Sequence, residues 1–149
     1  MNTNGGKEPI EILLVEDNPG DIRLTKEAFK DCKIESNLSV VMDGDEAIEY
    51  LKREGKYQDS VKPQLVLLDL NLPKINGLEV LKEIKSNVKF KMIPVIILTT
   101  SKAEEDIVNA YTANANCYIN KPVDLDGFYK IIESIEYFWF STAVFPPKS

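Results

Sequence analysis

The chain has 149 residues, about one domain's worth, and its 44% hydrophobic and 28% charged residues are typical of a globular protein. Its net charge of -6 argues against nucleic-acid binding, which needs a basic face, and favours a protein partner. The sequence has no histidine, which excludes imidazole bases, Ser-His-Asp and Cys-His nucleophile pairs and most zinc sites. Any chemistry must use carboxylates, hydroxyls and lysine.

Membrane attachment is not expected. No segment approaches the roughly 20 apolar residues that span a bilayer. The N-terminal sequence MNTNGGKEPIE lacks the apolar core of a signal peptide. We therefore expect a cytoplasmic protein.

Apolar runs that predict β-strands alternate along the chain with stretches of helical periodicity. The strands are expected at residues 10–17, 38–42, 65–70, 93–100 and 115–121. Three apolar stripes at helical spacing lie after the first, third and fifth runs: Ile22, Thr25, Phe29 and Cys32; Leu78, Leu81, Ile84 or Lys85, and Val88; Leu125, Phe128, Ile132, Ile135 and Trp139. Three pairs predict capped helix starts: Asp43 with Glu46, Asn76 with Glu79, and Ser101 with Glu104. The pattern indicates five βα units.

The character of the runs predicts their order in a sheet. The first, third and fourth are almost continuously apolar, as in parallel strands that are covered on both faces. The second alternates and the fifth is diluted by Asn116 and Asn120, so we place both at the edges. With right-handed crossovers this gives a doubly wound α/β fold with a five-stranded parallel sheet in the order 2-1-3-4-5. Ligands bind such sheets at the carboxyl ends of strands one and three.

Polar residues stand at the carboxyl ends of four predicted strands. Strand one ends in Glu16 and Asp17, strand three in Asp69, strand four in Thr99 and strand five in Lys121. One polar residue at a strand end usually just meets solvent, but several at the same rim predict a functional site.

Three carboxylates at one rim favour a metal ion. Two like charges about 4 Å apart repel by roughly 4 kcal/mol at an effective dielectric near 20. Oxygen donors without histidine or thiolate suit a hard ion, so we expect Mg²⁺, with Mn²⁺ or Ca²⁺ as substitutes. Asp69 is then a candidate nucleophile for aspartyl-phosphate chemistry, while Lys121 and the Thr99 hydroxyl would contact phosphoryl oxygens.

This set of residues, in a chain of five βα units, resembles the receiver domain of two-component response regulators, with a flavodoxin-like (βα)5 fold. The resemblance covers about residues 9–140. It implies that Asp69 is the phosphoacceptor and that Glu16 and Asp17 are the acidic pair that holds Mg²⁺. Asn71 falls where the family lends a backbone carbonyl to the metal. The activity implied is Mg²⁺-dependent self-phosphorylation and slow autodephosphorylation, without enzymatic turnover.

The resemblance also implies a conformational switch. Thr99 matches the hydroxyl that reorients toward the phosphoryl group, Tyr118 the aromatic switch residue and Lys121 the phosphate-binding lysine. Ser101 and Asn71 resemble positions that tune the lifetime of the phosphoryl group. In this family the bond after the lysine is usually cis, so we expect a cis peptide bond between Lys121 and Pro122.

Four stretches resemble a narrower group, the small response regulators paired with bacterial phytochrome kinases. They are DLNLPKINGLEVL, LTTSKAEEDI, NCYINKP and IEYFWFSTAVFP. A phosphorelay with a sensor histidine kinase is expected, and a sensor other than a phytochrome remains open.

The ends of the chain complete the expected domain organisation. Residues 1–8 are expected to be a flexible N-terminus and residues 141–149 a C-terminal tail too short for an effector domain, so the output should be a protein contact with a downstream target. The last helix carries apolar residues beyond its stripe: Tyr129, Ile131, Phe138 and Phe140, followed by Val144 and Phe145. We expect a homodimer through the fourth helix, fifth strand and fifth helix together with the aromatic tail; folding of the tail over its own domain is the alternative. Residues 52–63 are expected to form a solvated loop rather than a partner contact.

Other functions fit less well. A haloacid-dehalogenase-like phosphatase needs a second aspartate where Asn71 stands. The acidic loop VEDNPGD would repel the phosphate of a flavin, and the glycine-rich lysine loop of a nucleotide hydrolase is absent. A constitutive pseudo-receiver scaffold remains an alternative, against which the intact site argues.

Overall fold

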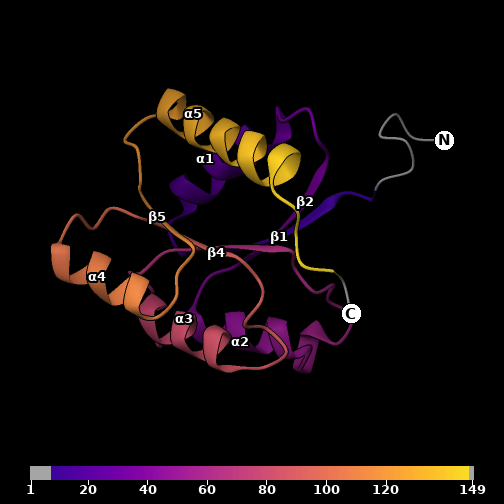
Figure 1. Ribbon diagram of the computed structural model, residues 1–149, viewed down its shortest axis with the longest axis vertical. Coiled ribbons are helices and arrows are strands. Elements are labelled where there is room, and N and C mark those ends of the chain that lie inside the picture. Colours follow the sequence, from indigo (N-terminus) through magenta and orange to yellow (C-terminus); the bar gives the residue numbers. More distant parts are fainter. Residues whose placement is uncertain (1–7, 148–149) are drawn as a thin grey trace.

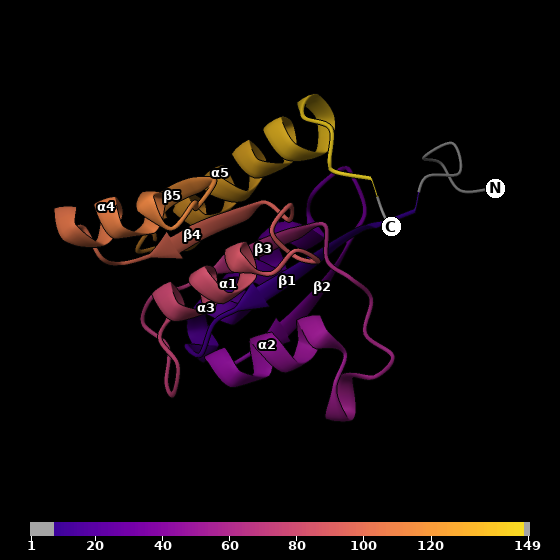
Figure 2. The same cartoon turned by 60° about the horizontal axis from the view of Figure 1, so that its bottom comes forward.

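The computed structural model describes residues 8–147, which form a parallel five-stranded sheet (Figures 1 and 2). The strand order is β2-β1-β3-β4-β5, as predicted, with β2 and β5 at the edges. The strands are β1 (Ile10–Val15), β2 (Ser36–Val41), β3 (Leu65–Leu68), β4 (Val95–Thr99) and β5 (Cys117–Asn120). The expected flexible N-terminus falls almost entirely on residues 1–7, outside the described residues.

Helices cover both faces of the sheet (Figure 1). One layer contains α1 (Pro19–Lys30) and α5 (Leu125–Ile135), and the other contains α2 (Gly44–Lys52), α3 (Gly77–Ser86) and α4 (Glu104–Thr112). In the described part of the chain no helix is both long and apolar enough to cross a bilayer.

The central strands separate two hydrophobic cores. Successive side chains of β1 point to opposite faces, so Leu13 and Val15 join the core beneath α2, α3 and α4, while Ile12 and Leu14 join the core beneath α1 and α5. All residues of β3 and β4 are buried. The prediction that these strands are covered on both faces is confirmed.

Side chains cap four of the helices. The predicted caps at Asp43 and Asn76 are confirmed, since each accepts a hydrogen bond from the backbone N–H three residues later. Asn18 and Asp124 cap α1 and α5 in the same way. The predicted cap at Ser101 is wrong. Because the preceding loop stays extended through Ala103, α4 begins at Glu104, without a side-chain cap.

Two expected stripe residues do not reach the core. Val88 is 76% exposed because α3 ends at Ser86 and the apolar stripe stops at Ile84. Leu125, the first residue of α5, is 41% exposed.

The segment at residues 52–63 is mostly exposed, as expected, but it is anchored to α2. It contains a short 3₁₀ turn (Gly55–Tyr57). The Tyr57 ring lies edge-on to Tyr50 with centroids 5.2 Å apart, and its hydroxyl donates a hydrogen bond to Glu46. The Ser60 hydroxyl donates to the Tyr50 carbonyl at 3.0 Å.

The C-terminal aromatic residues divide between core and surface. After α5 the chain continues in a π-helical turn (Glu136–Thr142). Phe140 stacks on Phe29 with centroids 6.3 Å apart, and Phe145 stacks on Trp139 at 6.0 Å, so this part of the tail folds over its own domain. Tyr137 is 74% exposed, in contrast.

Candidate functional site at the carboxyl edge of the sheet

Three carboxylates converge where β1 and β3 end. Val15 pairs with Leu68 across these neighbouring strands, so Glu16 and Asp69 leave the sheet side by side. One carboxylate oxygen from each of Glu16, Asp17 and Asp69 lies within 4.8 Å of the others. Glu16 and Asp69 are buried, at 2% and 5% exposure.

Lys121 reaches this cluster from two strands away. It directly follows β5, and its side chain extends past the end of β4. The ammonium nitrogen donates to Glu16 Oε1 at 2.6 Å, to Asp69 Oδ2 at 2.7 Å and to Asp21 Oδ2 at 2.8 Å. Each of its three N–H groups therefore has a carboxylate acceptor, and the side chain is only 4% exposed.

Asp21 is a member of the site that sequence reasoning missed. It lies in the first turn of α1, which Asn18 caps by accepting a hydrogen bond from the Asp21 N–H at 3.0 Å. The available signal was a third acid in the loop VEDNPGD, four residues after Asp17. The helix start turns this acid back toward Lys121.

The site carries excess negative charge. Burial, reinforced by the charge of Asp69, raises the pKa of Glu16 to about 7, although the hydrogen bond from Lys121 opposes this. Burial alone would lower the pKa of Lys121, but its hydrogen bonds to Asp21, Asp69 and Glu16 outweigh that effect and raise it. A single ammonium thus faces a group of acids whose carboxylate oxygens suit a divalent cation.

Backbone contacts fix the position of Asp69. Its N–H donates to the Val15 carbonyl at 3.1 Å, and its Oδ1 accepts from the Asn71 N–H at 3.1 Å. The start of α3 approaches this loop so closely that a Cβ on Gly77 would lie 2.1 Å from the Asp69 carbonyl oxygen. Only glycine fits there, a requirement that the sequence did not reveal. The role of the Asn71 carbonyl as a metal ligand stays a prediction.

Thr99 and Tyr118 lie along the same edge. Thr99 is fully buried at the end of β4, and its carbonyl accepts a hydrogen bond from the Lys121 N–H at 2.7 Å. The half-buried Tyr118 donates its hydroxyl to the Ser101 carbonyl at 2.9 Å. The Ser101 N–H makes a long contact of 3.5 Å with Thr99 Oγ1. The strand ends are thus linked through the loop between β4 and α4.

The expected cis bond between Lys121 and Pro122 is wrong, because this bond is trans. The trans form is locally favoured for an X–Pro bond by about 0.5–1 kcal/mol unless tertiary contacts override the preference.

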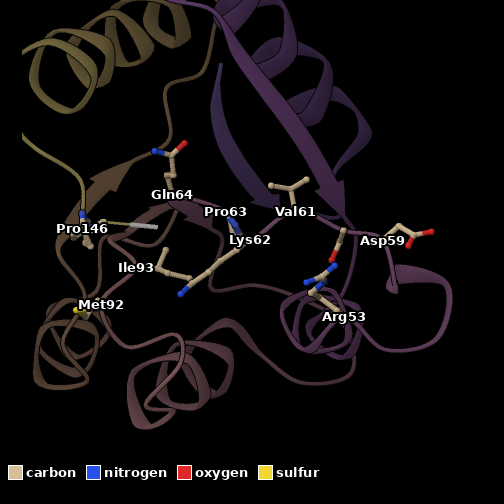
Figure 3. Close-up of a pocket in the computed structure, with 11 residues that line it drawn as sticks. Arg53, Asp59, Val61, Lys62, Pro63, Gln64, Met92, Ile93 and Pro146 are labelled. Atoms are coloured by element: carbon tan, nitrogen blue, oxygen red, sulfur yellow. The ribbon is translucent and has the colours of Figure 1, made fainter. Parts of the chain in front are cut away.

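A separate pocket of about 350 Å³ lies at the opposite end of the sheet (Figure 3). Gln64 and Ile93 line it just before β3 and β4 begin, and Pro146 contributes from the C-terminal segment. Because the strands are parallel, their beginnings lie far from the acidic cluster at their ends. The pocket is therefore distinct from the candidate site.

Comparisons with known proteins agree with this geometry. The family model described as response regulator receiver domain matches residues 12–133. Response regulator Rcp1 of Synechocystis sp. is 45% identical over 138 residues, which cover 93% of this chain and 94% of Rcp1.

Solved structures give the same result. The phosphorylated cyanobacterial phytochrome response regulator RcpA superposes with a TM-score of 0.90 at 47% identity, covering 94% of this chain and all of that chain. The Mn²⁺-bound form of Rcp1 superposes with a TM-score of 0.88 at 45% identity, covering 93% of this chain and all of that chain. These findings confirm the receiver resemblance and the flavodoxin-like fold, and this chain belongs to the response regulator receiver domain family.

Proposed function

We propose that Asp69 accepts a phosphoryl group from a sensor histidine kinase and thereby switches a protein-interaction surface. The observation that carries this proposal is the position of Asp69 Oδ2, 2.7 Å from the Lys121 ammonium, in a carboxylate cluster whose oxygens lie within 4.8 Å of one another. Such a site places a nucleophilic oxygen beside a cation that can receive phosphoryl charge.

The transfer step uses groups that already lie at the rim. An Asp69 carboxylate oxygen attacks the phosphorus of a phosphohistidine; an O–P bond forms as the P–N bond breaks. The imidazole nitrogen leaves with the bonding electron pair and takes a proton from solvent. The Lys121 ammonium then redirects hydrogen bonds from carboxylates to phosphoryl oxygens.

Mg²⁺ is the proposed cofactor, held by Glu16, Asp17 and Asp69 with the Asn71 backbone carbonyl. When bound, it supplies positive charge that offsets the carboxylates and the incoming phosphoryl oxygens. The Mn²⁺-bound structure of Rcp1 supports a divalent ion, and Mn²⁺ or Ca²⁺ would act as substitutes.

The proposed switch connects Asp69 to the α4–β5 surface. The Thr99 hydroxyl turns toward the phosphoryl group, and the loop that contains Ser101 follows, together with Tyr118. Phosphorylation then shifts the population toward the partner-binding form. The hydrogen bond from Tyr118 to the Ser101 carbonyl supports this path.

The proposed kinase is a phytochrome-type sensor, and the proposed place of action is the cytoplasm. The support is the similarity to RcpA, which is described as a phytochrome response regulator. Within this proposal residues 9–140 form the receiver domain, and the output is a contact with a downstream protein rather than with nucleic acid or a membrane.

We also propose a homodimer through α4, β5 and α5. Exposed apolar side chains support it: Val108 and Tyr111 on α4, Val123 before α5, and Tyr137 and Phe138 in the turn that follows α5. Such an interface would cover these exposed apolar side chains on α4 and after α5. Trp139, Phe140 and Phe145 contribute less, since they pack on their own domain.

The test is phosphorylation of the purified protein by a small phosphodonor with Mg²⁺, read by intact mass. The wild type should gain one phosphoryl group and Asp69→Asn none, while Asp59→Asn, in the distant loop, should label normally. Labelling of Asp69→Asn would contradict the assigned acceptor. Sustained phosphate release would favour a phosphatase of the haloacid dehalogenase type, and a wild type that never labels would favour the constitutive scaffold.

A further inference from the structure

The Ser101 carbonyl accepts two side-chain hydrogen bonds from β5. One comes from the Tyr118 hydroxyl at 2.9 Å and the other from the Asn120 side-chain amide at 2.8 Å. Tyr118 and Asn120 are two residues apart on a strand, so their side chains lie on the same face. A carbonyl oxygen has two lone pairs, and β5 thus supplies a donor to each of them.

Ser101 is also tied to α4. Its hydroxyl donates to an Asp106 carboxylate oxygen in the first turn of α4 and accepts a weaker bond from the Ala103 N–H at 3.4 Å. Ser101 is therefore not the cap of α4, but its hydroxyl connects the β4–α4 loop to the first turn of that helix. The position of Ser101 is therefore coupled to the position of the first turn of α4.

Asn120 directly precedes Lys121, whose ammonium lies in the acidic cluster and whose N–H donates to the Thr99 carbonyl at 2.7 Å. Because the two residues are adjacent in the chain, a movement of the Lys121 backbone also moves Asn120. From Asn120 the contact passes to the Ser101 carbonyl without involving the Thr99 hydroxyl.

We propose that Asn120 is a positioning residue of the switch. Its carboxamide holds the Ser101 carbonyl where Tyr118 can bind it, before any phosphoryl group is present. Asn120 thus forms a second connection from the acidic site to α4, in addition to Thr99. The role of Asn120 in the switch rests on the proposed function. The hydrogen bond by which Asn120 positions the loop exists in the unphosphorylated protein.

The ordinary alternative is that Asn120, an exposed amide on an edge strand, contributes nothing. Its geometry argues otherwise, because a 2.8 Å bond to a backbone carbonyl that a second donor also holds is specific. Loss of one net hydrogen bond shifts the equilibrium between the closed and the locally open loop by roughly fivefold.

The experiment compares Asn120→Ala with the wild type by amide hydrogen exchange over residues 99–106, without metal or phosphodonor. Asn109→Ala is the matched control, because its amide lies on α4 and makes no side-chain hydrogen bond within the described residues. We expect exchange in Asn120→Ala to be roughly fivefold faster, with the unfolding equilibrium in urea shifted by no more than the same factor and Asn109→Ala like the wild type. Equal exchange in Asn120→Ala and the wild type, or an equal increase in Asn109→Ala, would overturn the proposal.

A double-mutant comparison separates positioning from local loosening. If Asn120 acts on the acceptor of Tyr118, Asn120→Ala should accelerate exchange less in a Tyr118→Phe background than alone. Additive effects would overturn the link to Tyr118.

Phosphorylation of Asp69 is measured separately by intact mass. A wild type that does not label would refute the proposed function, whereas the exchange data without phosphodonor would still decide whether Asn120 positions the loop.

Discussion

Replacing Lys121 by methionine should strongly destabilise the protein. The ammonium donates to Glu16, Asp69 and Asp21 at 2.6–2.8 Å, and the Lys121 and Glu16 side chains are 4% and 3% exposed. Methionine fills a similar volume but leaves buried carboxylates without a counter-charge.

The size of the effect follows from this burial. Removing one partner of a buried ion pair costs about 3–5 kcal/mol, because the remaining charge is uncompensated. We expect a loss of that size in the free energy of unfolding, a large part of the 5–15 kcal/mol typical of a domain. Saturating Mg²⁺ should stabilise Lys121→Met more than the wild type, since the ion replaces the lost charge and meets no ammonium.

Urea unfolding at neutral pH, with and without Mg²⁺, measures both effects. Lys102→Met, at an exposed lysine between β4 and α4, is the control and should change stability by less than about 0.5 kcal/mol. A loss below about 1 kcal/mol in Lys121→Met would refute the view that this lysine neutralises the buried acids.

Three further predictions concern packing. Gly77→Ala should cost more than about 2 kcal/mol in urea unfolding and slow labelling of Asp69, because its Cβ would meet backbone at 2.1 Å, whereas Gly20→Ala, with a side-chain atom at 3.2 Å, should be far milder. Tyr57→Phe should lose about 1 kcal/mol in thermal or urea unfolding, since the Glu46 carboxylate loses the tyrosine donor and keeps the Lys56 ammonium at 3.5 Å; equal stability would contradict that contact. Phe140→Ala should lose about 2 kcal/mol through its contact with Phe29. Phe138→Ala should lose about 1 kcal/mol through its edge-on contact with Trp139 at 5.2 Å, and it should also weaken the proposed dimer in sedimentation experiments.

Much of the fold could be predicted because its signals are local. Continuous apolar runs identified β1, β3 and β4 as strands covered on both faces, and the weaker runs identified the edges. Right-handed crossovers then left one strand order. Parallel strands end at the same side of a sheet, so the sequence also brought Glu16, Asp69, Thr99 and Lys121 to one edge.

Loop and helix-end details were predicted less well. Ser101 has the residue type of a cap, but its position relative to α4 depends on how the loop is held by Asp106, Tyr118 and Asn120. The aromatic tail could pack on its own domain or on a partner, and the contact of Phe140 with Phe29 joins residues more than a hundred positions apart. No local pattern encodes such a choice.

The sequence by itself determined the α/β architecture, the strand order and the acidic edge. Hydrophobic periodicity within each short segment identifies the strands and helices, and the right-handed connections between consecutive strands fix their order. Only the tertiary structure decided that Lys121 bonds Asp21 as well as Glu16 and Asp69, and that Gly77 must lack a side chain. Those facts depend on where side chains of separate elements point and how closely backbones approach, and packing of the whole domain sets both.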